Sequence, residues 1–212
     1  MVFFASFFSM QANAQDYPQS NFGVDVGVNF SKFSVEGASL NSRPGFYIAG
    51  TYEHLLLKNL PLYLETGVQF SQKRSQLDIL QLDILIATAT INGFYAEVPV
   101  MLNYKFFLPY ELIVYPCIGA YYGFGIGGQI KSSVLGFEEE KTSLFGEEGF
   151  LSRSDFGLRA GCAAEWNRLA LGLNYEYGLL NVSPEQKNRY LEFLNFSRCQ
   201  ILILNKYGAI VF

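Results

Sequence analysis

Ionisable residues recur in this sequence at alternate positions, between apolar neighbours, and glycines share the same alternation. Charged side chains on one buried face need counter-ions within reach, since an unpaired buried charge is costly. The pattern therefore predicts an internal network of ion pairs. Its expected members are Asp25, Glu53, Glu65, Glu97, Lys105, Arg159, Glu165 and Glu176.

Arg159 is the expected counter-ion of this network, for carboxylates such as Glu65 and Glu97. Satisfied polar networks of this kind stabilise an interior, so a structural role is our default interpretation. A pathway for protons or ions is the alternative.

Catalytic chemistry has little support in the sequence. Hydrolysis needs a positioned nucleophile and a base, yet His54 is the one histidine and has no recognisable serine partner. A membrane-lipid hydrolase remains an alternative only if a carboxylate replaces the usual base. We expect no enzyme activity, no catalytic residue and no cofactor.

Cysteine spacing and net charge exclude further classes of function. Cys117, Cys162 and Cys199 are widely separated, which favours neither a metal site nor a disulfide framework. Alternation places Cys117 inward and Cys162 outward. A net charge of -4 offers no basic surface for nucleic acid.

The charged residues are positioned by segments that alternate with a period of two. From Phe22 to Phe30, apolar residues alternate with small or polar ones, as in a strand with one apolar face. Similar segments recur to the C-terminus. Strands are expected near 22–35, 44–57, 62–74, 91–106, 111–127, 154–166, 168–180 and within 190–212.

Short and long connections alternate between these segments, which is the layout of an outer-membrane barrel. Short connections are expected near 58–61, 107–110 and at Asn167, and long ones near 36–43, 75–90, 128–153 and 181–189. We predict a closed antiparallel eight-stranded transmembrane β-barrel, an up-and-down meander, with its long loops outside the cell and a filled lumen. A soluble sandwich or lipocalin-like barrel is the alternative.

Composition agrees with a membrane barrel. Half of the residues are hydrophobic, and only 16% are charged, against about 25% in soluble domains. Aromatic residues gather at the strand ends, which suits the two interfaces of a bilayer. They are Tyr104, Phe106, Tyr110 and Trp166 at one end, and Phe70, Phe94, Tyr122, Phe124, Tyr175 and Tyr177 at the other.

Residues 1–14 are predicted to form a secretory signal peptide, because a short apolar run precedes Ala12-Asn13-Ala14. No Lys or Arg precedes the run, which leaves open a signal whose start is missing, and a buried N-terminal strand is the alternative. Residues 15–212 are expected to form a single barrel domain in the outer membrane of a Gram-negative bacterium.

The segment Tyr95–Tyr104, YAEVPVMLNY, resembles the Y-x-E-[IV]-P-[LV]-x-L-x-Y strand of PorT-like outer-membrane β-barrels of Bacteroidetes. Glu65–Lys73 and Tyr177–Asn181 resemble further motifs of that family. The resemblance covers about residues 20–190. It implies residence in the outer membrane and carries no catalytic constellation; family members range from secretion-associated factors to barrels of unknown role.

Pro99 within this motif predicts an irregular strand, because proline removes a ladder hydrogen bond. Matching faces would place it opposite Cys117 or Gly119. A bulge that aims Glu97 into the lumen and a tolerated kink are equally good interpretations.

Two expected outer loops could contact a partner. The first is apolar and includes Leu82 and Ile84, although it could equally be strand extension above the membrane. The second holds Glu138, Glu139 and Glu140 near Phe145; its solvated charges lack the ligand spacing of a calcium loop.

We therefore expect a non-enzymatic envelope component that contacts outer-membrane lipid and binds another envelope or secretion protein through its loops. A narrow channel or a small-ligand barrel is the alternative.

Overall fold

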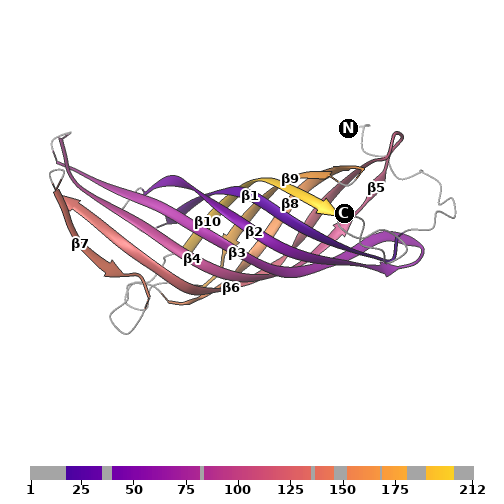
Figure 1. The fold of residues 1–212 in the computed structure, drawn as a ribbon, viewed down its shortest axis with the longest axis horizontal. Helices are drawn as coiled ribbons and strands as arrows, with labels where there is room; N and C mark the ends of the chain where they lie inside the picture. The colour runs from indigo at the N-terminus through magenta and orange to yellow at the C-terminus, as the bar shows by residue number, and fades with distance from the viewer. Residues whose placement is uncertain are drawn as a thin grey trace, which may run out of the picture.

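The computed structural model describes residues 18–34, 40–81, 84–134, 137–145, 152–167, 169–180 and 190–202. The predicted signal peptide, residues 1–14, lies outside them. The described residues form antiparallel strands that run obliquely along an elongated body (Figure 1). The strands are β1 (Ser20–Ser34), β2 (Leu40–Leu57), β3 (Leu60–Gln81), β4 (Ile84–Tyr104), β5 (Phe106–Phe107), β6 (Leu112–Val134), β7 (Phe137–Ser143), β8 (Ser154–Trp166), β9 (Leu169–Gly178) and β10 (Tyr190–Leu202).

Eight of these strands close into a ring in the order β1-β2-β3-β4-β6-β8-β9-β10, since β4 pairs with β6 and β10 pairs with β1. The two remaining strands, β5 and β7, each pair with β6. The predicted eight-stranded antiparallel meander is confirmed, and the closing strand, which the sequence left vague, is β10. No helix in the described part of the chain is long and apolar enough to cross a membrane.

The tight turns lie together at one end of the barrel. They lie at Lys58–Asn59, at 108–111 and around Asn167, and three non-glycine residues there adopt positive φ: Tyr110 (63°), Glu111 (59°) and Asn167 (57°). In outer-membrane barrels the short turns face the periplasm, so the opposite mouth faces outward. We call the two ends the inner and the outer mouth.

Three strands are much longer than the barrel wall requires. With 22, 21 and 23 residues, β3, β4 and β6 extend beyond the outer mouth, accompanied by β7 (Figure 1). Part of segment 75–90, expected as a loop, is instead paired strand on β3 and β4, so the alternative of strand extension was the correct one. Similarly, β6 continues to Val134 and pairs with β7 inside the expected loop 128–153.

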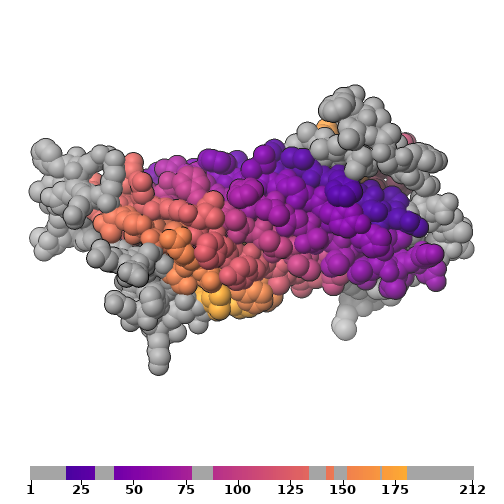
Figure 2. Space-filling view, turned by 60° about the horizontal axis from the view of Figure 1, so that its bottom comes forward, coloured from indigo at the N-terminus to yellow at the C-terminus, as the bar shows by residue number. Residues whose placement is uncertain are grey.

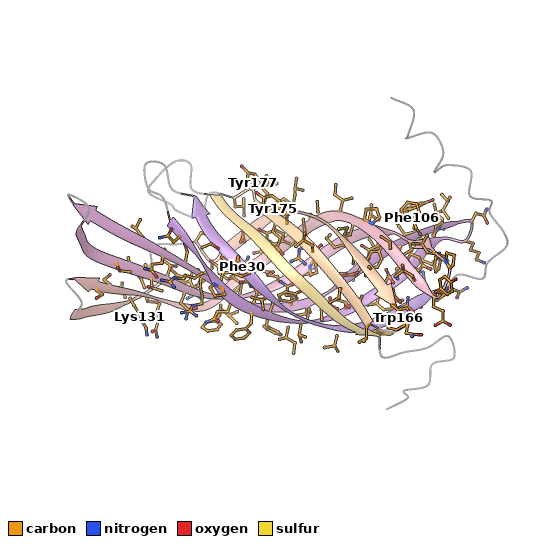
Figure 3. All side chains as sticks on the ribbon, turned by 90° about the horizontal axis from the view of Figure 1, so that it is seen from above. Phe30, Phe106, Lys131, Trp166, Tyr175 and Tyr177 are labelled. Carbon is orange, nitrogen blue, oxygen red and sulfur yellow. The ribbon has the colours of Figure 1, made fainter. Side chains whose placement is uncertain are left out.

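The outward face of the wall is apolar, as the alternation predicts. Among its most exposed side chains are Leu171 (65%), Ile118 (63%), Trp166 (62%) and Phe46 (59%). The described strands form a continuous wall in Figure 2. Figure 3 shows Phe106 and Trp166 near the inner mouth, and Phe30, Tyr175 and Tyr177 at a level nearer the outer mouth.

The register around Pro99 differs from the expected one. Pro99 lies opposite Tyr121, whereas Cys117 lies opposite Asn103. The irregularity between β4 and β6 falls at Phe94–Tyr95 rather than at Pro99. Local alternation tells which face a residue occupies, but the stagger between strands depends on how the barrel closes.

Candidate functional site

The interior of the barrel is polar and contains every charged residue expected in the lumen. Their side chains belong to residues that are only 0–7% exposed. They point inward because each occupies the strand position that alternates with a lipid-facing residue. These residues are Asp25, Glu53, Glu65, Glu97, Lys105, Arg159, Glu165 and Glu176.

Lys73 forms the centre of a cluster near the outer mouth, which we call the outer cage. Its Nζ lies 2.6 Å from Glu97 Oε1 and 3.3 Å from Asp155 Oδ2. The same ammonium lies 4.7 Å from the ring centroid of Tyr95 and 5.2 Å from that of Tyr121. Two carboxylates and two aromatic faces thus compensate the buried cation.

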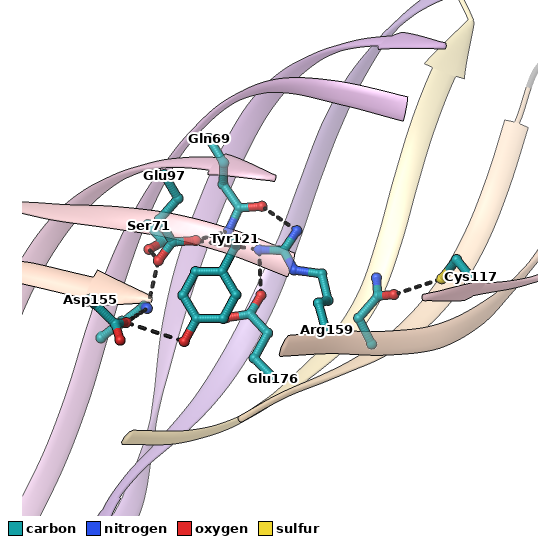
Figure 4. Close-up of polar contacts among 10 residues, drawn as sticks. Gln69, Ser71, Glu97, Cys117, Tyr121, Asp155, Arg159 and Glu176 are labelled. Carbon is teal, nitrogen blue, oxygen red and sulfur yellow. Dashed lines mark hydrogen bonds and ion pairs between the residues drawn. The ribbon is translucent and has the colours of Figure 1, made fainter. Parts of the chain in front are cut away.

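Arg159 extends the outer cage across the lumen (Figure 4). Its Nη2 lies 2.5 Å from Glu176 Oε1 and 3.4 Å from Glu97 Oε2. Glu97 also accepts hydrogen bonds from Gln69 Nε2 at 2.8 Å and Ser71 Oγ at 2.9 Å. One fully buried carboxylate therefore joins both cations of the cage.

Lys105 forms the centre of a second cluster near the inner mouth, the inner cage. Its Nζ lies 2.6 Å from Glu53 Oε2 and 3.4 Å from Glu165 Oε2. The rings of Tyr63 and Tyr115 lie 4.8 and 5.2 Å from it. The inner cage thus repeats the arrangement of the outer one, with a lysine between two tyrosine rings and two carboxylates.

Asn103 links the inner cage to the middle of the barrel. Its Nδ2 donates to Glu53 Oε1 at 3.1 Å and to Glu65 Oε2 at 2.7 Å. The expectation that Arg159 serves both Glu65 and Glu97 is therefore met for Glu97 only. Glu176, rather than Glu65, makes the shorter ion pair with Arg159.

Between the two cages lies a cavity of about 20 Å³, enough for roughly one water molecule. Its lining includes Asp25, Glu65 and Arg159. Beside it, Cys117 Sγ donates to Asn174 Oδ1 at 3.2 Å. A space of this size is too small for an organic ligand.

Two apolar residues close the outer mouth. Leu144 and Phe145 follow β7 and are 0% and 4% exposed. The Phe145 ring meets the Tyr95 ring edge to face, with 5.6 Å between centroids. A Cβ on Gly125 would lie 2.5 Å from Phe145 Cζ, so glycine there leaves room for the ring. We call Leu144 and Phe145 the plug.

The residues expected in partner-binding loops lie in different parts of the structure. Phe145 is buried in the plug and is not available to a partner in this arrangement, because its ring fills the space above Tyr95. Ile84 begins β4, and Glu138, Glu139 and Glu140 belong to β7. Leu82 lies outside the described residues.

His54 lies on the outward face of β2 near the inner mouth. Its Nδ1 is 3.4 Å from the hydroxyl of Tyr52, and the two rings stack at 6.3 Å between centroids. This neighbourhood supplies no activated nucleophile to the imidazole. Among the described residues, no group of three or more His, Cys, Asp or Glu side chains is arranged to hold a metal ion.

Lys73 and Asp155 were not among the expected lumen residues, although both lie at the centre of the outer cage. A signal existed, because Lys73 shares the alternation of Glu65 and Gln69 along β3, and Asp155 shares that of Arg159 along β8. Both residues stand near expected strand ends, where a charged side chain is equally compatible with exposure to solvent.

Comparison with known proteins places this geometry in a family. No curated protein sequence matches the chain significantly. Among solved structures, it is similar to Ail, the attachment invasion locus protein of Yersinia pestis, solved in complex with the heparin analogue sucrose octasulfate (16% identity, 86% of this chain and 99% of that chain, TM-score 0.41). It is also similar to Neisserial surface protein A (14%, 86% and 97%, TM-score 0.45) and to OprG from Pseudomonas aeruginosa (12%, 90% and 96%, TM-score 0.40).

The model of one family, described as outer membrane protein beta-barrel domain, matches residues 11–183, which is most of the chain. Its description agrees with the closed sheet, the apolar outward face and the polar lumen seen here. The chain therefore belongs to the outer membrane protein beta-barrel domain family and resides in the outer membrane of a Gram-negative bacterium.

Proposed function

We propose that this protein is a non-enzymatic envelope component whose barrel is a closed anchor and whose working surface is the sheet raised above the outer mouth. The observation that supports this most is the filled lumen, in which two cages and the plug leave a cavity of only about 20 Å³. A barrel filled in this way would act through its exterior.

The raised sheet suits a protein partner. The long strands β3, β4 and β6, with the short strand β7, carry paired backbone well beyond the lipid-facing belt, which gives a rigid surface rather than a set of loops. Rigid surfaces lose less conformational entropy on binding than loops do. We favour another envelope protein as partner, in a secretion-associated setting, as the resemblance to PorT-like barrels implies.

In-cell photocrosslinking tests the partner. A crosslinking residue at Gln129 or Ser143, both exposed on the raised sheet, is expected to give one protein adduct of the same mass from both positions. The matched control is Trp166, exposed at the opposite end of the barrel, where that adduct should be missing. The absence of an adduct from both raised positions would refute partner binding through this surface.

Planar bilayers test the closed lumen separately. The purified protein is expected to show no single-channel openings. Stable ion conductance from the intact protein would overturn the anchor and favour the narrow channel instead.

A further inference from the structure

Two arginines face each other just above the lipid-facing belt. Arg43 on β2 and Arg74 on β3 are direct cross-strand partners. Arg43 lies three residues from the exposed Phe46, and Arg74 lies four residues beyond the exposed Phe70. Like charges placed directly opposite each other in a sheet are destabilising, so this pair needs an anion.

A bulge in β2 brings Arg43 to that face. Between the pairs Tyr47–Ser71 and Arg43–Arg74, β2 contributes one residue more than β3. Arg43 then donates a hydrogen bond to Gln76, which stands two residues from Arg74 on β3 and hence on the same face. Simple alternation would have grouped Arg43 with the inward Tyr47.

A third cation, Lys131 on β6, stands on the same outward side. It is exposed and lies opposite Thr90 of β4. Figure 3 shows Lys131 farther toward the protruding strands than Phe30. Arg74 Nε is buried without a hydrogen-bond partner among the described side chains.

No acidic residue stands between Arg74 and Lys131 in the register of β3, β4 and β6. The register from Arg74 runs through Asn92 to Gln129, two residues before Lys131. With strands about 4.8 Å apart and about 3.3 Å per residue, Arg74 and Lys131 are roughly 12 Å apart.

Arg43 and Arg74 lie at the height of the lipid headgroups. Three or four residues of a tilted strand rise roughly 7–10 Å above the last apolar ring. The headgroup layer begins at the edge of the hydrocarbon core and is about 5–8 Å thick on each side. Long basic side chains reach back into that layer.

We propose that Arg43, Arg74 and Lys131 form a site for the phosphate groups of an anionic lipid in the outer leaflet. An arginine pair presents several N–H donors to a phosphate, and such charge-assisted bonds are strong. Lys131 binds a second phosphate of the same headgroup. The like-charge pair of Arg43 and Arg74 is thereby neutralised from the membrane side.

Lipid binding by the full chain in detergent tests the site. Lipid A carrying two phosphates is expected to raise the midpoint temperature of the heat-dependent gel shift, and its apparent Kd should weaken about fivefold for each cation replaced by alanine. The variants are Arg43→Ala, Arg74→Ala, Lys131→Ala and the triple. Lys58→Ala, which removes an exposed charge from the β2–β3 turn at the inner mouth, should bind as the unmodified chain does.

Further probes identify the source of the phosphate. Dephosphorylated lipid A and inorganic phosphate at the same concentration are each expected to give less than a tenth of the shift. Equal protection by the dephosphorylated lipid, equal protection by inorganic phosphate, or unchanged affinity in the triple variant would each overturn the proposal. If the triple variant gives no gel shift of its own, Arg74→Gln and Lys131→Gln answer the same question singly.

Discussion

The outer and inner cages each surround a buried lysine with carboxylates and tyrosine rings. The two cages differ in how these groups are connected. In the outer cage, Glu97 joins Lys73 and Arg159. In the inner cage, Glu53 serves Lys105, which has Glu165 in addition. The outer cage is also covered by the plug. A lysine between two carboxylates therefore occurs twice along the barrel, while a carboxylate shared by two cations, Glu97, is described in the outer cage.

Removing the shared carboxylate should have the largest effect. Glu97→Ala removes the carboxylate that Lys73 and Arg159 share, which leaves Lys73 with Asp155 and Arg159 with Glu176, and breaking a buried ion pair costs about 3–5 kcal/mol. Glu53→Ala should cost clearly less, because Glu53 pairs with Lys105 whereas Glu97 pairs with both Lys73 and Arg159. Denaturant unfolding in detergent, followed by the gel shift, measures both.

Glu97→Gln is the control for shape, since it keeps the volume and loses the charge. It should fall between the unmodified chain and Glu97→Ala. If Glu53→Ala were as destabilising as Glu97→Ala, the two cages would be equivalent and the contrast drawn here would be wrong.

Displacing the plug should have an intermediate effect that is confined to the outer cage. Gly125→Val puts side-chain atoms where the Phe145 ring lies, and overpacking typically costs about 1–3 kcal/mol. Gly127→Val is the matched control, because a Cβ there meets nothing within 4 Å.

Fluorescence reports the position of the plug. With Phe145→Trp in a Trp166→Phe background, Gly125→Val should shift the emission to longer wavelength, since the indole becomes hydrated, whereas Gly127→Val should not. Identical spectra for the two glycine variants would show that the ring stays in place or moves without exposure.

The smallest effects separate the two tyrosines of the outer cage. Tyr121→Phe removes the hydroxyl that donates to Asp155 at 3.2 Å, which should cost about 1 kcal/mol. Tyr95→Phe should be neutral within about 0.5 kcal/mol, because its buried hydroxyl has no hydrogen-bond partner in the described structure. Thermal unfolding of the two variants side by side checks this, and the reverse order would contradict the geometry of the cage.

Much of the fold could be predicted from local pattern. Apolar side chains at alternate positions, such as Phe22 and Val26, face outward, while Asp25 and Asn29 are 4% and 2% exposed. Strand β8 has the predicted bounds of 154–166. Strand lengths above the membrane were predicted less well, because β3 and β4 remain paired where their sequences give no lipid-facing alternation.

The cages needed information that no single segment contains. Arg159 meets Glu176 and Glu97 from different strands, and the sequence could suggest only that it meets some carboxylate. Phe145 resembled an exposed loop residue but occupies the space above Gly125. Cross-lumen distances depend on strand tilt and stagger, which are properties of the closed ring.

The sequence by itself determined the fold class, the number of strands in the ring, the end that carries the short turns, and the face on which each strand residue lies. All of these follow from a period of two and from the lengths of the connections. Only the tertiary structure decided which charges pair, that the outer mouth is plugged, and that a bulge places Arg43 opposite Arg74. Those facts depend on closing the ring, which sets the register of all eight strands together.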